Sequence, residues 1–340
     1  MTDIKQIRRL QLTGGSTYIV SLPKSWIDDL QLKKNSGITL IKNANDSITL
    51  FQDQPSKKTR AITVIGKNDS TEAIRRKIIA IYLSGHNTIE IKTKGMEISS
   101  IHRGVIRDLV RTTLMGTEIV ESSSEKMVLQ VLTQLSQLSF EVALKRMYMT
   151  ATNMHREAIQ ALKESNIEYA EEVVKMDDEV DRFSLYMMRN LNLSLENVQV
   201  LFDSGLKKPS ECLGYRTVVK CVERIADHAA LVAKKVKYLN SPIDKKTLKE
   251  IEDLSEDSLT VFEKSITAFS KKDYIMAEKV ASSVSKVIEK EKKQMDSLKL
   301  VDNTSILKLI LEDIRRTAEY SSDISEVVMD ETVQSVIEES

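Results

Sequence analysis

The sequence has few of the residues that stiffen or cross-link a chain. Its 340 residues include four prolines and two cysteines, and aromatic residues make up 5% of the total. So few prolines leave long stretches free to form uninterrupted helices, which favours a mainly α-helical protein. Cys212 and Cys221 lie in one expected helix at a spacing where their side chains do not meet. We therefore expect both thiols to be reduced and to serve as packing residues.

Long apolar runs are also missing. No stretch approaches the roughly 20 apolar residues that span a bilayer, and the N-terminus has no apolar segment of signal-peptide length. The sequence therefore predicts a cytoplasmic protein without a transmembrane segment. The whole chain is balanced, with 50 basic and 50 acidic residues, but its first 60 residues are basic. Such an asymmetry is typical of a contact with nucleic acid or an anionic membrane, and equally of solvated loops.

Residues 1–55 are expected to form a β-rich module. Apolar and β-branched residues recur at period two, which predicts strands over residues 18–22, 37–41 and 47–51. A short helix is expected to begin at Pro23 and to end near Leu30 to Leu32. A module of this size buries little surface alone, so an intertwined homodimer would complete its core.

Residues 60–125 are expected to form a small α/β connector. Strands near 61–65, 88–91 and 118–120 alternate with helices over 71–83 and 98–114. The segment contains no glycine-rich phosphate loop, so this part of the sequence gives no support for nucleotide binding by such a loop.

From residue 126 onward the apolar spacing is helical, beginning with Leu129, Leu132, Leu135 and Leu138. Local breaks divide this region into six helices, and their short connections imply antiparallel neighbours. Residues 161–173 align with residues 268–280, so we interpret the region as a duplicated three-helix bundle, over 126–240 and 243–330. The predicted fold class is multidomain α+β, predominantly α.

Two acidic pairs are the strongest candidate site. Asp177 and Asp181 lie four residues apart in one expected helix, and Glu223 and Asp227 repeat that step in the next. Each pair therefore lies on one face of its helix. Two such pairs can converge on a hard cation, because carboxylate oxygens replace its water ligands while the metal removes their repulsion. Alternatively, the acids are surface charges with basic partners on the same helices, namely Arg182, Lys220 and Arg224.

The segments Asp177-Asp178-Glu179-Val180-Asp181 and Glu223-Arg224-Ile225-Ala226-Asp227-His228-Ala229 resemble motifs of the phosphate uptake regulator family, PhoU. That family consists of tandem three-helix bundles whose acidic motifs bind metal clusters. The resemblance covers about residues 126–330. It implies one cluster of iron, zinc, manganese or magnesium in the first bundle, with the ligands Asp177, Asp181, Glu223 and Asp227.

The same resemblance implies a regulator and not an enzyme. It would modulate high-affinity phosphate transport and phosphate signalling through contacts with a transporter component or a signalling kinase. The second bundle departs from the family pattern, because Val284 and Ile288 stand opposite Asp177 and Asp181, and Arg315 stands where the first bundle has Glu223. We therefore expect no second equivalent metal site.

The N-terminal segment is similar to another family. Gly15-Ser16-Thr17-Tyr18-Ile19-Val20-Ser21-Leu22-Pro23-Lys24-Ser25-Trp26 and the stretch from Leu30 to Gly37 resemble the AbrB/SpoVT swapped-hairpin DNA-binding domains, which dimerise. This resemblance implies phosphate contacts from Lys5, Arg8, Arg9 and Lys24, which give salt-dependent affinity and little sequence information. The combination of both parts resembles the fused PhoU regulators of archaea.

Two alternatives remain open. The first is a di-metal carboxylate enzyme with the same four ligands, but bundle enzymes of that class normally supply a Glu-x-x-His arrangement, which the sequence lacks. The second is an adaptor that binds a phosphate transporter without contacting DNA or metal. The four histidines are scattered, and His228, one residue beyond Asp227, is expected to point away from the acidic face.

Overall fold

The structure, a computed structural model, describes residues 5–42, 47–52, 59–132, 138–298 and 303–337. Its internal contacts divide the chain into two units, Met1–Lys57 and Lys58–Ser340. Leu135, one of the residues of the expected helical spacing, lies outside the described residues.

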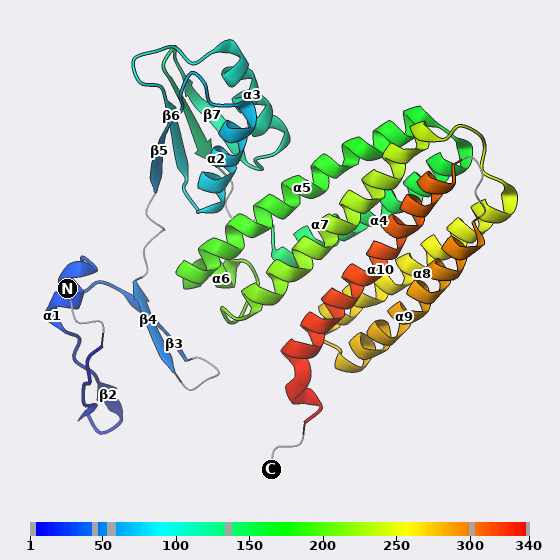
Figure 1. Cartoon of the computed structure of the whole chain (residues 1–340). Coiled ribbons are helices and arrows are strands. Elements are labelled where there is room, and N and C mark those ends of the chain that lie inside the picture. The colour runs from blue at the N-terminus through cyan, green and yellow to red at the C-terminus, as the bar shows by residue number, and fades with distance from the viewer. Residues whose placement is uncertain (1–4, 43–46, 53–58, 133–137, 299–302, 338–340) are drawn as a thin grey trace. The chain divides into compact units, whose positions relative to one another are not determined.

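The first unit contains two antiparallel hairpins and one short helix (Figure 1). Its elements are β1 (Gln11–Thr13), β2 (Thr17–Ile19), α1 (Lys24–Asp29), β3 (Ile38–Lys42) and β4 (Ile48–Gln52). Gly14 and Gly15 have φ values of 66° and 82°, which lets the chain turn between β1 and β2. The second and third expected strands and the helix after Pro23 are confirmed. The first expected strand is instead the shorter β2, and its partner β1 was not predicted.

This unit has almost no core of its own. Pro23 is its only buried residue among those whose side chains the structure describes. On the second hairpin Leu40 lies opposite Leu50, and their side chains are 65% and 42% exposed. Ile38 and Ile48 lie at alternate positions of the same two strands and are also exposed. The hairpin therefore has an apolar face that its own unit does not cover.

The second unit begins with a four-stranded sheet. Its elements are β5 (Arg60–Val64), α2 (Thr71–Leu83), β6 (Thr88–Lys92), α3 (Ser100–Thr112), β7 (Thr117–Ser122) and β8 (Lys126–Val131). The strand order is β5-β6-β8-β7, in which β5 and β6 are parallel and the other pairs antiparallel. Ser70 and Ser99 cap the two helices, each accepting a backbone N–H bond at 3.2 Å. Ile74, Ile106 and Leu129 belong to the core of this part.

Strand β8 corrects the expectation that the helical region begins at residue 126. Met127, Val128 and Leu129 are consecutive and buried, as is usual for a strand whose two faces are both covered. Apolar and polar residues do not alternate in the sequence of such a strand. Its apolar residues therefore merge with the helical spacing that follows, and the sequence predicts a helix there. The first helix of the bundle begins at Phe140.

The remaining residues form the helices α4 (Phe140–Glu164), α5 (Ile167–Glu196), α6 (Val198–Asp203), α7 (Glu211–Lys235), α8 (Lys245–Lys271), α9 (Tyr274–Ser297) and α10 (Thr304–Thr332). Helices α4, α5 and α7 pack together, as do α8, α9 and α10, and α10 also packs against α7 (Figure 1). The six long helices that were expected are therefore confirmed, and both bundles share one apolar core. Among the described residues, no helix is long and apolar enough to cross a membrane.

The proposed duplication is visible in the turns. Ser165 and Lys272 end α4 and α8 in the left-handed conformation, with φ values of 51° and 52°. Asn166 and Asp273 follow them, and each caps the next helix by accepting a backbone N–H bond three residues on. The same cap thus recurs at aligned positions, as a repeat requires.

Helix α5 also joins the sheet-containing part to the bundle. The buried guanidinium of Arg189 donates to the Tyr82 carbonyl, to the Gly85 carbonyl at 3.0 Å and to Asn87 Oδ1 at 2.9 Å. Three charge-assisted bonds from one side chain hold the end of α2 against α5.

Candidate functional site

The acidic pairs lie on the two neighbouring helices α5 and α7. Both helices bury apolar residues beside them, with Val180 and Ile225 fully buried. Burial of these residues fixes the rotation of each helix, so the residues before and after them lie near the α5–α7 contact. Asp177, Asp181 and Glu223 are half-buried, and Asp227 is exposed.

The structure brings the four predicted carboxylates within electrostatic reach of one another. The pKa of Asp177 is raised to about 7, first because burial disfavours the charged form and then by repulsion from Asp227 and Asp181. Burial likewise raises the pKa of Asp181 to about 6, with further repulsion from Glu223 and Asp227. Each α5 acid therefore senses acids on α7, as expected for pairs that face the same space.

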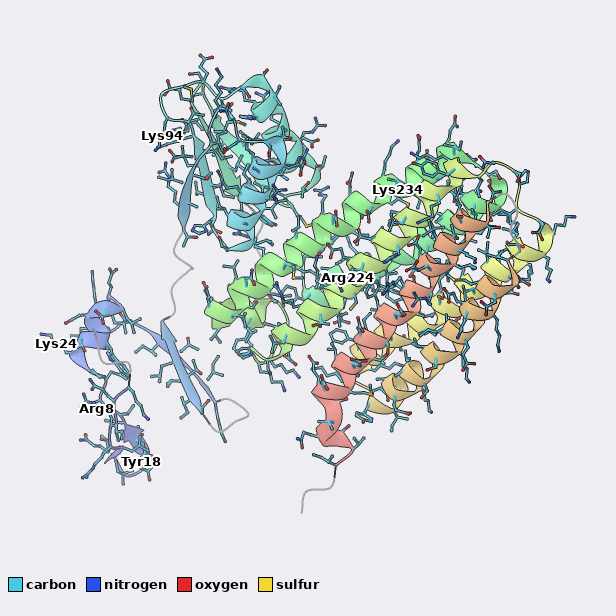
Figure 2. All side chains as sticks on the ribbon, viewed as in Figure 1. Arg8, Tyr18, Lys24, Lys94, Arg224 and Lys234 are labelled. Atoms are coloured by element: carbon cyan, nitrogen blue, oxygen red, sulfur yellow. The ribbon has the colours of Figure 1, made fainter. Side chains whose placement is uncertain are left out.

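Basic neighbours offset only part of this repulsion. Lys234 lowers the pKa of Asp177 and Lys220 that of Asp181, and Lys220 also pairs with Glu223. Arg224, labelled on α7 in Figure 2 together with Lys234, places its guanidinium 5.5 Å from the centre of the Tyr320 ring. If the acids were only surface charges, basic residues of the same helices would pair with them. Lys220 does so, whereas Arg224 packs on an aromatic ring.

The donor set has the chemistry of a site for a hard cation. Carboxylate oxygens are the ligands that such ions prefer, and Asp177 Oδ1 is buried without a hydrogen-bond partner in the described part of the chain. Within the same residues, no three Asp, Glu, His or Cys side chains are gathered closely enough to hold an ion. Binding would therefore require side chains on α5 and α7 to rotate toward a common centre.

We call the four carboxylates Asp177, Asp181, Glu223 and Asp227 the acidic array. In the second bundle, ion pairs take the place of this array. Arg315 on α10, aligned with Glu223, pairs with Glu319 and lies 3.4 Å from Glu291 on α9. The residues three positions earlier also differ in charge between the bundles. In the first bundle Lys220 pairs with Glu223, whereas in the second Glu312 pairs with Arg315 at 3.9 Å. A cation of the protein itself thus lies where a metal is expected in the first bundle.

His228 makes a contact between the two bundles that the sequence did not predict. Its Nδ1 lies 2.8 Å from Oδ1 of the buried Asp313 on α10, and Lys235 pairs with the other carboxylate oxygen. His228 and Lys235 are seven residues apart and so share one face of α7. That spacing was a signal in the sequence, but the acidic partner on a helix of the other bundle had none.

The predicted DNA contacts Lys5, Arg8, Arg9 and Lys24 are all exposed in the first unit. Figure 2 labels Arg8 and Lys24, whose side chains extend from the ribbon of that unit. Arg8 donates to Gln6 Oε1 at 2.7 Å, an exposed contact that leaves most of its donors available. Cys212 and Cys221 are free and buried, as expected.

Comparisons with known proteins give matches to part of the chain. Among curated protein sequences there is no significant match. Two solved structures are similar: the phosphate transport system regulatory protein PhoU from Streptococcus pneumoniae and PhoU from Pseudomonas aeruginosa. The first has 17% identity and a TM-score of 0.49, covering 60% of this chain and 98% of its own. The second has 19% identity and a TM-score of 0.46, covering 58% and 96%.

The PhoU domain family matches residues 144–236, which span α4, α5 and α7. The match includes all four clustered carboxylates. It does not extend to the sheet-containing part, the first unit or the second bundle. The first helical bundle of this chain is thus the part that matches the PhoU domain family.

Proposed function

We propose that the chain is a phosphate-responsive regulator of phosphate uptake and phosphate signalling that acts in the cytoplasm. The observation that carries this proposal is the PhoU domain match over residues 144–236, which contains the facing acidic pairs of α5 and α7. The PhoU family is regulatory and not enzymatic, which argues against a di-metal enzyme. The sequence also lacks the Glu-x-x-His arrangement that di-metal bundle enzymes normally supply.

The helical bundles would bind a metal cluster and a partner such as a transporter component or a signalling kinase. Asp177, Asp181, Glu223 and Asp227 are the proposed ligands. Burial raises the pKa values of Asp177 and Asp181, and repulsion from neighbouring acids raises them further. An iron, zinc, manganese or magnesium cluster would remove that repulsion. Arg315 and its acidic partners argue for one such site, in the first bundle.

The first unit would dimerise and bind DNA. The uncovered apolar face around Leu40 and Leu50 supports a second copy as its cover, because two such hairpins can complete one core. Lys5, Arg8, Arg9 and Lys24 are exposed and available for phosphates. An adaptor that docks on a phosphate transporter without contacting DNA is the second candidate, favoured by the match lying wholly in the helical part.

Elemental analysis of protein purified without a metal-affinity tag tests the metal assignment. Wild type should carry near-stoichiometric metal, and Asp181→Ala and Asp227→Ala should lose it. Glu172→Ala, an exposed acid of α5 outside the array, is the matched control. Metal-free wild type, or equal loss in the control, would remove the site assignment.

Phosphate uptake measured in cells that lack the protein tests the regulatory role. Restoring wild type should restore the response of uptake to external phosphate, and a variant with Arg8→Ala and Lys24→Ala separates the two candidates. If that variant restores the response as wild type does, the adaptor is favoured over the DNA-binding regulator. If wild type itself has no effect on uptake, the proposed function is wrong.

A further inference from the structure

A cavity of about 440 Å³ lies between α3 and α5, on another side of α5 from the acidic array. Its α5 residues follow a spacing of three or four, which places them on one face of that helix. The residues that matter here are Arg111 of α3 and Lys175, Asp178, Glu179, Arg182 and Phe183 of α5.

The charged groups of this cavity form no salt bridge within the described part of the chain. Salt bridges are frequent elsewhere in the second unit, but none joins Arg111, Lys175 or Arg182 to an acid, although two acids line the same cavity. Nε of Arg182 is buried and makes no hydrogen bond among the described residues. A buried guanidinium N–H without an acceptor is unfavourable, so a ligand that draws the Arg182 side chain into the cavity would give this group the acceptor it lacks.

We propose that this cavity binds a phosphate ester of a small hydroxylated molecule, such as a sugar phosphate or a nucleotide. Arg111, Arg182 and Lys175 would hold the phosphoryl oxygens, because guanidinium groups bind phosphate through paired donors. A free phosphate ion would leave most of the volume empty and the two carboxylates without a role. Hydroxyl groups of the ester would donate to Asp178 and Glu179, as ribose hydroxyls do to acids in other nucleotide sites.

The chain has no glycine-rich phosphate loop, so side chains must do the binding. The residues come from the sheet-containing part and from the first bundle, and the ligand would therefore bridge them. Asp178 and Arg182 each follow directly after a member of the acidic array, Asp177 and Asp181. Helix α5 would thus carry two sites on different faces. The proposal stands on this cavity and does not rest on the proposed regulatory function.

Isothermal titration calorimetry on the full chain tests the proposal. Ribose 5-phosphate and AMP should bind to wild type, and Arg182→Gln should weaken both about tenfold to a hundredfold through loss of a charge-assisted bond. Arg111→Gln serves as the second variant, because Arg111 is exposed and its replacement should not impair folding. Arg76→Gln, an exposed arginine of α2 outside the cavity, should bind as wild type does.

Two further titrations test whether the hydroxylated part of the ester contributes to binding. One uses inorganic phosphate as the ligand, and the other uses the double variant Asp178→Asn with Glu179→Gln. Phosphate alone should bind at least tenfold more weakly than the esters, and the double variant should weaken the esters without changing phosphate. Equal affinities for phosphate and esters would overturn the assignment of an ester. No binding by wild type, or the same loss in Arg76→Gln, would overturn the site.

Discussion

Arg315 Nε of α10 lies 3.4 Å from Glu291 Oε1 of α9, so the second bundle supplies its own cation to a buried carboxylate. Burial raises the pKa of Glu291, and Arg315 acts against that rise. The aligned residue Glu223 has the opposite charge and belongs to the acidic array of the first bundle. The duplicated fold thus pairs a buried acid with an arginine in the second bundle, whereas the first bundle places acids of α5 and α7 near one another.

Removing this arginine should destabilise the second bundle. Arg315→Ala leaves Glu291 buried without its cation, and we expect a loss of about 2 kcal/mol in the free energy of unfolding. Urea denaturation measures this loss. Arg316→Ala is the control, because Arg316 is 41% exposed and its pairs with Glu312 and Glu319 should contribute less than about 1 kcal/mol. Equal losses in both variants would contradict the role given to Arg315.

The contact between Gly85 and Leu193 gives a second prediction. Gly85 has a φ of 91°, and a Cβ there would lie 2.6 Å from Leu193 Cδ2. Gly85→Ala should therefore destabilise the second unit by about 2 kcal/mol, through backbone strain and crowding at the joint held by Arg189. Gly104→Ala, in α3 with open space around the position, should be neutral or stabilise by up to about 1 kcal/mol. Thermal or urea denaturation of both variants separates these effects.

The acidic array predicts how stability depends on pH in metal-free protein. The folded pKa of Asp177, about 7, exceeds the ordinary value of 3.8, so the folded state binds more protons than the unfolded state between these values. This contribution to stability is complete below about pH 4 and is lost as the pH rises through 7. Asp181 acts in the same direction up to about pH 6.

Urea denaturation at pH 5 and pH 8 measures this dependence. Wild type should lose more stability between the two values than Asp177→Asn, because the amide resembles the protonated acid and does not titrate. Glu172→Gln, an exposed acid on the same helix, should behave as wild type does. The opposite result would contradict the mutual repulsion of the four acids. In that case the free energy of unfolding would rise between pH 5 and pH 8, and it would rise more for wild type than for Asp177→Asn.

Local signals in the sequence were sufficient for most helices. Ser165 and Asn166, and their counterparts Lys272 and Asp273, form a turn and cap that recur in the repeat, and the apolar spacing on either side is helical. Strand β8 was missed because a strand buried on both faces does not alternate, and its apolar run merges with the spacing of the next helix.

Local sequence was sufficient to predict which residues form the acidic array, but not how the two helices that carry them pack. The four-residue spacing predicts that Asp177 and Asp181 share a face, whereas the facing of α5 and α7 depends on how apolar residues such as Val180 and Ile225 pack. The bond from His228 to Asp313 joins residues far apart in the chain, and such pairs have no sequence period. Tertiary packing alone places them together.

The apolar face of the second hairpin predicts the oligomeric state. Leu40 and Leu50 face each other across β3 and β4 and are exposed, so a second copy should bury them. Leu40→Lys would place a charge in that interface and should convert a dimer to a monomer at micromolar concentration, as measured by analytical ultracentrifugation. Leu213→Lys is the control, since Leu213 is 68% exposed on α7 in the other unit. If wild type is monomeric, or if Leu40→Lys remains a dimer with the affinity of the control, the hairpin face is not the interface.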